Sequence, residues 1–136
     1  MPFVIDASVA VSFLLQEDTS DAARSMIERL ADDPAIVPPI FPFECANALL
    51  SAERQHRISK EDADRQLANL LRLPILVLSP DPAHVVASLA IGREYGLSVY
   101  DAAYLQVARL MEVPLVTLDQ QLRDAADRAG VRSFGA

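Results

Sequence analysis

The chain has 136 residues, 51% of them hydrophobic, and a formal net charge of −7. A chain of this length buries about two-thirds of its unfolded surface, so we expect one domain spanning residues 1–136. The acidic balance argues against a nucleic-acid binder that relies on overall positive charge. No apolar run approaches the roughly 18 residues of a membrane span, and no basic segment precedes an apolar one as in a signal peptide. The lone Cys45 fits a reducing compartment, so we expect a cytoplasmic protein.

Short apolar segments alternate with helical patterns along the first half of the chain. Phe3-Val4-Ile5 is apolar and rich in β-branched residues, which is typical of a short buried strand. Three prolines between 38 and 42 predict a rigid bend, because each fixes its φ angle and lacks an N–H group. The expected elements are a strand at 3–5, a helix at 9–15, a helix capped by Thr19 or Ser20 that runs to 31, a strand at 35–37, and helices at 43–55 and 59–72.

The second half continues the same alternation and sets the fold class. The expected elements are strands at 74–78 and 115–118, helices at 81–96, 100–111 and 119–130, and a short edge strand at 131–134. The strand at 74–78 is expected to be buried, and the helix at 81–96 to turn Val85, Val86, Leu89, Ala90 and Ile91 inward. Alternating strands and helices with short connections predict an α/β fold, with a central parallel sheet of four to five strands flanked by helices on both faces.

Four acidic residues stand near the starts of expected helices: Asp6, Glu44, Asp101 and Asp119. Singly, each has an ordinary explanation, because Asp is a favoured N-cap and an acidic side chain in a first turn suits the helix dipole. Asp6 and Asp119, however, directly follow expected buried strands, and Asp101 lies in an apolar segment where an unpaired charge is costly. Active sites of parallel α/β sheets lie at the carboxyl ends of their strands, so we expect the four acids to converge there.

The residue types around these acids favour a hard divalent cation. No Lys or Arg is adjacent to any of the four, and carboxylates in one site repel one another unless a cation joins them. Oxygen ligands suit Mg²⁺ or Mn²⁺. Zinc is not favoured, because Cys45, His56 and His84 offer no ligand spacing. We expect Cys45 to pack in the core and both histidines, which lack acidic company in the sequence, to lie at the surface.

Four motifs in the same order resemble those of the PIN-domain ribonucleases, and among them the VapC-type toxins of toxin–antitoxin pairs. The motifs are Asp6-Ala7-Ser8, Phe43-Glu44-Cys45-Ala46-Asn47-Ala48-Leu49, Tyr100-Asp101-Ala102-Ala103-Tyr104-Leu105 and Thr117-Leu118-Asp119-Gln120-Gln121-Leu122. The likeness covers essentially the whole chain. It implies a three-layer α/β/α PIN-like domain and a metal-dependent endoribonuclease, with Mg²⁺ or Mn²⁺ as the cofactor.

The resemblance also assigns residue roles and partners. Asp6, Glu44, Asp101 and Asp119 match the acidic quartet, with Asp6 and Asp101 as the firmest metal ligands and the other two helping directly or through water. Ser8 and Thr117 match hydroxyl positions that orient carboxylates or water, and Asn47 matches a polar position beside the site. The implied partners are an RNA substrate, a cognate antitoxin and a second copy in a homodimer. Residues 9–15 and Met26 or Ile27 are candidate surfaces for the protein partners.

Two further groups each have two interpretations. Arg54, Arg57 and Lys60, which cluster near His56, either contact the RNA backbone or form a solvated helix end and turn. Tyr100 and Tyr104 either stack on a base or belong to the core or an interface.

Two rival functions deserve comparison with the nuclease. A phosphatase of the haloacid-dehalogenase type also begins with a strand that ends in aspartate, but its chemistry needs an acid two residues later, where this chain has Ser8. A catalytically weak domain that acts mainly by binding a partner predicts the loss of one or more of the acids, and all four are present.

Overall fold

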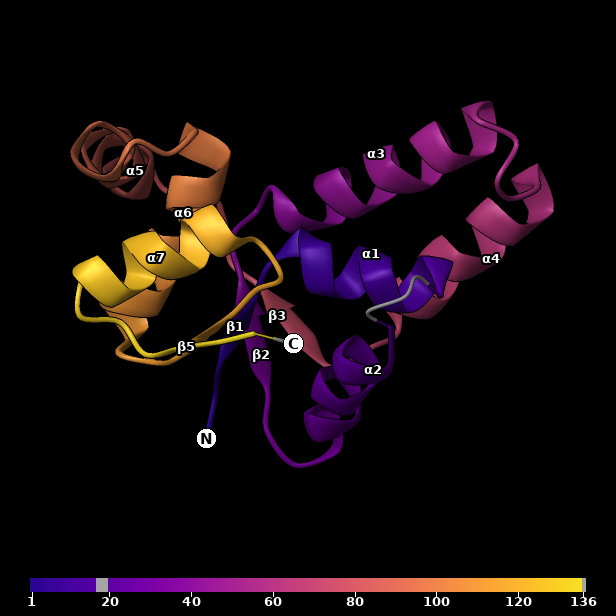
Figure 1. Ribbon diagram of the computed structural model, residues 1–136, viewed down its shortest axis with the longest axis horizontal. Helices are drawn as coiled ribbons and strands as arrows, with labels where there is room; N and C mark the ends of the chain where they lie inside the picture. The colour runs from indigo at the N-terminus through magenta and orange to yellow at the C-terminus, as the bar shows by residue number, and fades with distance from the viewer. Residues whose placement is uncertain (17–19, 136) are drawn as a thin grey trace.

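Five parallel strands form the centre of the computed structural model, which describes residues 1–16 and 20–135 (Figure 1). The strands are β1 (Val4–Ile5), β2 (Ala35–Val37), β3 (Ile75–Val77), β4 (Leu115–Val116) and β5 (Ser133–Phe134). They form two ladders, β1-β4-β5 and β2-β3. A parallel bridge between Phe3 and Ala35 joins the ladders, with a 2.9 Å hydrogen bond from Ile36 N–H to Phe3 O. The order across the sheet is therefore β3-β2-β1-β4-β5.

Helices cover both sides of this sheet, and Figure 1 shows them in two groups. On the right lie α1 (Ala7–Leu15), α2 (Ser20–Glu28), α3 (Phe41–Arg54) and α4 (Lys60–Leu71). On the left lie α5 (Pro82–Tyr95), α6 (Val99–Met111) and α7 (Gln120–Arg128). A 3₁₀ turn, Arg29–Ala31, follows α2. The predicted three-layer α/β/α architecture is confirmed. Within the described part of the chain, no helix is both long and apolar enough to cross a bilayer.

The strand order reverses beside β1. The chain runs from β1 to β2 to β3 in one direction across the sheet, then returns to place β4 on the other side of β1. Doubly wound sheets bind their ligands at such a reversal, outside the carboxyl ends of the strands. The fold thus marks the carboxyl ends of β1 and β4, where Asp6 and Asp119 stand, as the expected ligand site.

The core lies around the central strands. Val4, Ile5, Leu115 and Val116 are completely buried, as expected for parallel strands with helices on both faces. Leu105 of α6 is also fully buried, in the same apolar cluster. Each such aliphatic side chain contributes about 1.5–3 kcal/mol relative to an exposed one. The ends of β1 and β4 are therefore held rigidly.

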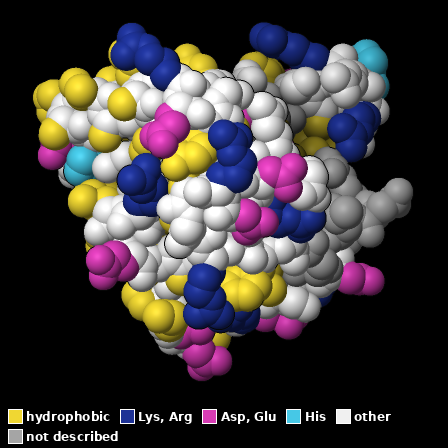
Figure 2. Space-filling model, turned by 60° about the vertical axis from the view of Figure 1, so that its left-hand side comes forward, with side chains coloured by type: hydrophobic (Ala, Val, Ile, Leu, Met, Phe, Trp, Pro, Cys, Tyr) yellow, Lys and Arg dark blue, Asp and Glu magenta, His cyan; other side chains and the backbone are white. Residues whose placement is uncertain are grey.

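The predicted inward face of α5 is wrong for most of its residues. Val85 is 62% exposed and Val86 70% exposed, and Leu89 and Ala90 are exposed as well, whereas Ile91 is buried as expected. The reason is that α5 packs mainly against α6, outside the sheet. Figure 2 shows hydrophobic side chains gathered at the upper left of the molecule, on the side where α5 lies.

The predicted burial of β3 is also wrong. Leu76 is 56% and Val77 42% exposed, while Ile75 is half-buried. β3 pairs with β2 on one side and forms an edge of the sheet, so its apolar residues lack cover on both faces. Composition alone does not separate an edge strand from a central one.

Helix boundaries follow local sequence signals with small shifts. Ser59 and Asp81 cap α4 and α5 as predicted, each accepting a hydrogen bond from a backbone N–H of the first turn. Helix α3 begins at Phe41, two residues earlier than expected, because Pro42 is accommodated in its first turn, where no N–H partner is needed. Of the two predicted caps of α2, Thr19 lies outside the described residues and Ser20 is the first helical residue.

Candidate active site

Four carboxylates from four separate elements belong to this end of the sheet. Asp6 links β1 to α1, and Asp119 lies between β4 and α7, so both sit at the strand reversal. Glu44 lies in the first turn of α3, and Asp101 in the first turn of α6. Asp6 and Asp119 are also N-caps, as their sequence positions predict. Asp101 is not, because Ser98 caps α6 and accepts the Asp101 N–H at 3.1 Å.

Asp6 is buried and held by two hydroxyl groups. Only 5% of the residue is exposed. Ser8 Oγ donates to Asp6 Oδ1 at 2.5 Å, and Thr117 Oγ1 donates to Asp6 Oδ2 at 2.5 Å. A third and longer hydrogen bond, 3.4 Å, comes from the Val9 N–H of α1. Both carboxylate oxygens are therefore fixed in direction.

Backbone groups orient both hydroxyls. Leu118 N–H donates to Ser8 Oγ at 3.1 Å, and Asp119 N–H donates to Thr117 Oγ1 at 3.0 Å. Because each oxygen already accepts an N–H, its own proton is directed towards Asp6. The roles predicted for Ser8 and Thr117, which orient a carboxylate, match this arrangement. The same bonds tie the β1–α1 turn to the β4–α7 turn.

Three of the four acids have raised pKa values. Burial raises the pKa of Asp6 to about 6; the hydrogen bonds lower it in part, and the charge of Asp101 raises it further. Burial also raises the pKa of Glu44, and again Asp101 adds to the effect. The pKa of Asp101 is raised by burial and then by the charge of Asp119. Asp101 thus interacts electrostatically with each of the other three acids.

Tyr104 is a part of the site whose role the sequence did not reveal. Its side chain is 1% exposed, so the predicted core position is confirmed, whereas Tyr100 is 60% exposed and is not in the core. Tyr104 Oη donates to Glu44 Oε1 at 2.6 Å and thereby connects α6 to α3. A signal was available, since a buried tyrosine hydroxyl normally needs a hydrogen-bond partner.

Cys45 packs in the core beside the acids, as predicted. The residue is fully buried. Burial raises the pKa of its thiol to about 12, and the charges of Glu44 and Asp6 add to the shift. The thiol therefore stays protonated at neutral pH and does not provide a nucleophile or a thiolate ligand.

The chemistry of the donor set fits a hard cation. Among residues 1–16 and 20–135, no ion pair involves any of the four acids, and no group of three or more His, Cys, Asp or Glu side chains is arranged as a metal-ligand cluster. Mg²⁺ is commonly held by only one or two carboxylates and keeps several water ligands, so a closed protein cage is not required. Carboxylates that raise one another's pKa without a compensating cation form a suitable oxygen-donor site.

The other predicted site residues lie further out. Asn47 is exposed, one turn beyond Glu44 on α3. Arg54, Arg57 and Lys60 are exposed around the α3–α4 turn, and Lys60 pairs with Asp64 at 2.8 Å. Ten residues of helix separate Glu44 from Arg54, which is about 15 Å along the axis. This basic group therefore does not join the acids.

The two histidines are placed differently from one another. His56 is exposed in the α3–α4 turn, as predicted. His84 lies in α5 with Nε2 3.9 Å from Asp81 Oδ2, so the expectation that it lacks acidic company is wrong. Asp81 caps the same helix one turn earlier, a proximity that the sequence spacing could have indicated.

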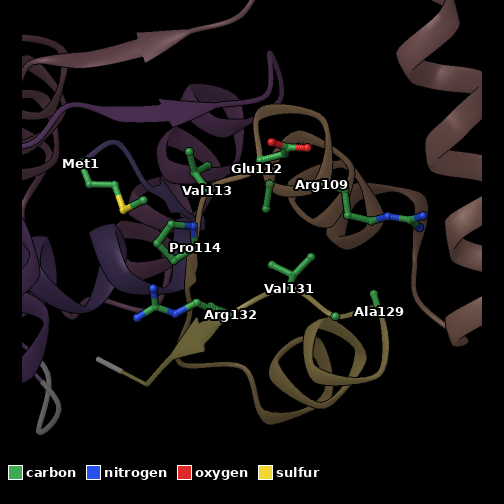
Figure 3. A pocket seen from close by; sticks show the side chains of 10 residues that line it. Met1, Arg109, Glu112, Val113, Pro114, Ala129, Val131 and Arg132 are labelled. Carbon is green, nitrogen blue, oxygen red and sulfur yellow. The ribbon is translucent and has the colours of Figure 1, made fainter.

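A pocket of about 370 Å³ lies at the opposite end of the sheet and is a poor candidate for an active site. Its lining includes Met1, which precedes β1, and Pro114, which precedes β4, so it sits at the amino ends of these strands. Figure 3 shows that Arg109 and Arg132 extend away from each other, in opposite directions, instead of converging on the pocket.

Comparison with known proteins gives the family. The family model described as PIN domain matches residues 3–128. The chain is 26% identical over 125 residues to "Ribonuclease VapC3" of Pyrobaculum aerophilum, covering 91% of this chain and 94% of that protein. The crystal structure of PAE2754 from the same organism aligns with a TM-score of 0.73 at 25% identity, over 98% of this chain and 92% of that one. A toxin–antitoxin complex from Klebsiella pneumoniae has the same fold, with a TM-score of 0.61 at 19% identity over 88% of each chain. The chain belongs to the PIN domain family.

Proposed function

We propose that the chain is a metal-dependent endoribonuclease that hydrolyses RNA phosphodiester bonds and acts as the toxin of a toxin–antitoxin pair. One observation carries the proposal: Asp6 is buried between two orienting hydroxyls, and the charge of Asp101 acts on it as well as on the other acids. The name of the Pyrobaculum relative, a ribonuclease, supports the choice of RNA as substrate. An RNA substrate and the unpaired Cys45 support a cytoplasmic setting.

We assign the acids to metal binding. Asp6 and Asp101 are the proposed direct ligands of Mg²⁺ or Mn²⁺, and Glu44 and Asp119 act directly or through water. Such an ion, when bound, lowers the pKa of a water molecule and stabilises the leaving oxygen of an in-line displacement. Ser8 and Thr117 keep both oxygens of Asp6 in place, while Tyr104 fixes one oxygen of Glu44. The acids are thereby held before the substrate arrives.

RNA contacts extend beyond the acids in this proposal. Asn47 is next to Glu44 on the exposed face of α3 and is suited to a polar contact near the scissile phosphate. Arg54, Arg57 and Lys60 are assigned to the RNA backbone at a distance, where exposed cations interact with phosphates. Their distance from Glu44 means that they would bind a remote part of the strand.

Protein partners are expected at other surfaces. An antitoxin and a second copy of the chain are proposed, with the Klebsiella toxin–antitoxin complex as the structural analogue of the former. Val9, Leu14 and Ile27 are buried inside the chain and are not available for such surfaces. The expected residues that are only partly buried are Val11, Phe13, Leu15 and Met26. Phe43, which is 73% exposed, and Leu71, which is 63% exposed, remain accessible.

The phosphatase alternative is less well supported. The Ser8 hydroxyl is 2.5 Å from Asp6, where the phosphatase chemistry needs an acid. The alternative of a domain that only binds a partner is also disfavoured, because all four acids are present and Asp101 interacts electrostatically with each of the other three.

The decisive experiment is RNA cleavage by the purified chain with Mg²⁺, with Mn²⁺ and with EDTA. Asp6→Asn and Asp101→Asn are tested beside Asp62→Asn, a matched control that changes only an exposed ion pair with Arg65 on α4. We expect cleavage only with added metal, near-complete loss in the first two variants, and wild-type cleavage in the control. Full activity in EDTA would exclude the proposed mechanism.

A further inference from the structure

A second pocket, of about 290 Å³, opens beside the acids. It lies at the carboxyl ends of β2 and β3, because its lining includes Pro38, which directly follows β2, and Leu78, which directly follows β3. This is the same edge of the sheet that carries Asp6. α5 and α6 supply most of the remaining wall.

The pocket is lined by residues that are close in the chain to two of the acids. Tyr100 lines it and directly precedes Asp101 in α6. Ile40 also lines it, and the carbonyl of Ile40 accepts the Glu44 N–H at 3.0 Å. A strand of RNA whose phosphate lies at the acids would thus have an adjacent nucleotide within reach of this pocket.

Gln106 is one of several polar residues that line the pocket. The residue is only 7% exposed, and within the described part of the chain its side-chain amide has no hydrogen-bond partner. Every fully enclosed side-chain nitrogen or oxygen of the described residues does have one, so the amide must face accessible space. Gln106 lines the pocket and also borders a shallow groove between α5 and α6. The amide is therefore open to water, which a ligand in the pocket would replace as the hydrogen-bond partner.

The walls fit a flat, largely apolar ring. Their surface is mostly apolar, and Val99, Ala103 and Val107 contribute from α6. Polar residues also line the pocket, namely Ser79, Asp81, His84 and Ser88. The volume is close to the lower limit of about 300–1,000 Å³ for small-molecule sites, so there is room for one ring system. Tyr100, which is 60% exposed at the rim, presents an aromatic face on which a base can stack.

We propose that this pocket holds one nucleobase of the RNA, an adenine, next to the scissile phosphate, with Gln106 contacting its edge and Tyr100 stacking on it. The inference rests on the proposed ribonuclease function and adds its base preference. A glutamine amide offers one donor and one acceptor side by side, which complements the N6 donor and N7 acceptor of adenine. Guanine presents two acceptors at the same positions and leaves the amide oxygen facing an acceptor.

Binding is tested without catalysis, so that it can succeed or fail independently of the nuclease activity. AMP and GMP are titrated in EDTA into the ¹⁵N-labelled chain, and the side-chain amide signals of Gln106 are followed by NMR. We expect AMP to shift these signals and to bind about tenfold or more tightly than GMP, the order of one bidentate contact. Equal affinities for AMP and GMP would overturn the inference. So would changes in the Gln106 signals that follow protein concentration and not nucleotide, because these would show that a second copy of the chain covers the pocket.

Two variants separate base selection from stacking. Gln106→Leu, which keeps the size of the side chain, is expected to abolish the difference between AMP and GMP, whereas Gln66→Leu on α4 is a control outside the pocket that should preserve it. Tyr100→Leu, at an exposed position, should weaken both nucleotides to a similar extent and leave their ratio unchanged. A ratio unaffected by Gln106→Leu in a folded variant would refute the role of Gln106.

Cleavage provides the second readout. A random-sequence RNA pool is cut with Mg²⁺ present, and the ends are sequenced. We expect wild-type cuts to be enriched beside adenine and the cuts made by Gln106→Leu to lose that enrichment. Cleavage without any enrichment would remove the inference and leave the nuclease intact, whereas AMP binding without cleavage would remove the proposed nuclease function alone.

Discussion

Replacement of Asp6 by asparagine is expected to stabilise the metal-free protein at neutral pH, although it should abolish activity. Burial raises the pKa of Asp6 from 3.8 to about 6, which means that its ionised form is less favourable in the folded chain than in the unfolded one. Asparagine keeps the shape and is an equally good N-cap, but it carries no charge. The unfavourable charge is therefore removed while the cap of α1 remains.

The size and sign of the effect follow from proton linkage. Between pH 3.8 and about 6 the folded state binds more protons at Asp6 than the unfolded state, so the free energy of unfolding falls as the pH rises through this window. The shift of about two pKa units corresponds to about 3 kcal/mol at pH 7. This figure already includes the hydrogen bonds from Ser8 and Thr117, which lower the pKa in part. In the variant an amide nitrogen replaces one carboxylate oxygen, so one of the two hydroxyls loses its acceptor, at about 1 kcal/mol at any pH. The net gain at pH 7 is then about 2 kcal/mol.

The quantity to measure is how the stability difference between variant and wild type changes with pH. The lost acceptor costs the same at every pH, whereas the unfavourable charge of Asp6 is present at pH 7 and nearly absent at pH 4. Urea unfolding is followed by circular dichroism at pH 4, 5, 6 and 7 in EDTA for the wild type, Asp6→Asn and the surface control Asp64→Asn. The stability difference between Asp6→Asn and wild type should increase by about 2 kcal/mol from pH 4 to pH 7, and that for the control should change little. The same difference at both pH values would refute a raised pKa at Asp6.

Three further outcomes test the arrangement around this acid. Thr117→Val should lower the free energy of unfolding by about 2 kcal/mol in urea titrations, because Asp6 and the Asp119 N–H each lose a buried partner, and Thr117→Ser should recover most of it. Tyr104→Phe removes the bond that lowers the pKa of Glu44, so the acidic limb of the pH–activity profile should move to higher pH; an unchanged limb would contradict a role for that bond. Mg²⁺ affinity measured by calorimetry should fall by up to about tenfold per pH unit below pH 6, because Asp6 must ionise to bind, and a pH-independent affinity would argue against Asp6 as a ligand.

The positions of Asp6 and Asp119 could be predicted because local sequence determines them. A short apolar strand followed by an aspartate and a helical pattern leaves little choice about where the carboxylate lies. The orienting roles of Ser8 and Thr117 followed from the family motifs, which are also local. The regular alternation of strands and helices then predicted the parallel sheet and its layers of helices.

Contacts between distant segments could not be predicted from the sequence. The bond between Tyr104 and Glu44 joins residues 60 positions apart, and nothing local specifies which acid a buried hydroxyl contacts. The same applies to α5, which is apolar around most of its circumference, so its pattern did not identify the face that packs against α6. Gln106 is a third case, because only the packed structure shows that this residue is 7% exposed and lines a pocket.

The structure separates the two interpretations of Asp6 that the sequence left open. Asp81 shows what a capping aspartate requires: its side chain is 50% exposed and accepts the Ala83 N–H at 2.9 Å. Asp6 differs from Asp81 because it is buried. Its capping hydrogen bond from the Val9 N–H is the longest of its three, at 3.4 Å, whereas the two hydroxyl groups donate to it at 2.5 Å. An aspartate that only caps a helix is more favourable when it is exposed, because exposure avoids the cost of burying a charge. A fold that keeps a destabilising charge fixed at a strand reversal, beside three more acids, is explained by a ligand that neutralises it, and this places Asp6 at the centre of the proposed metal site.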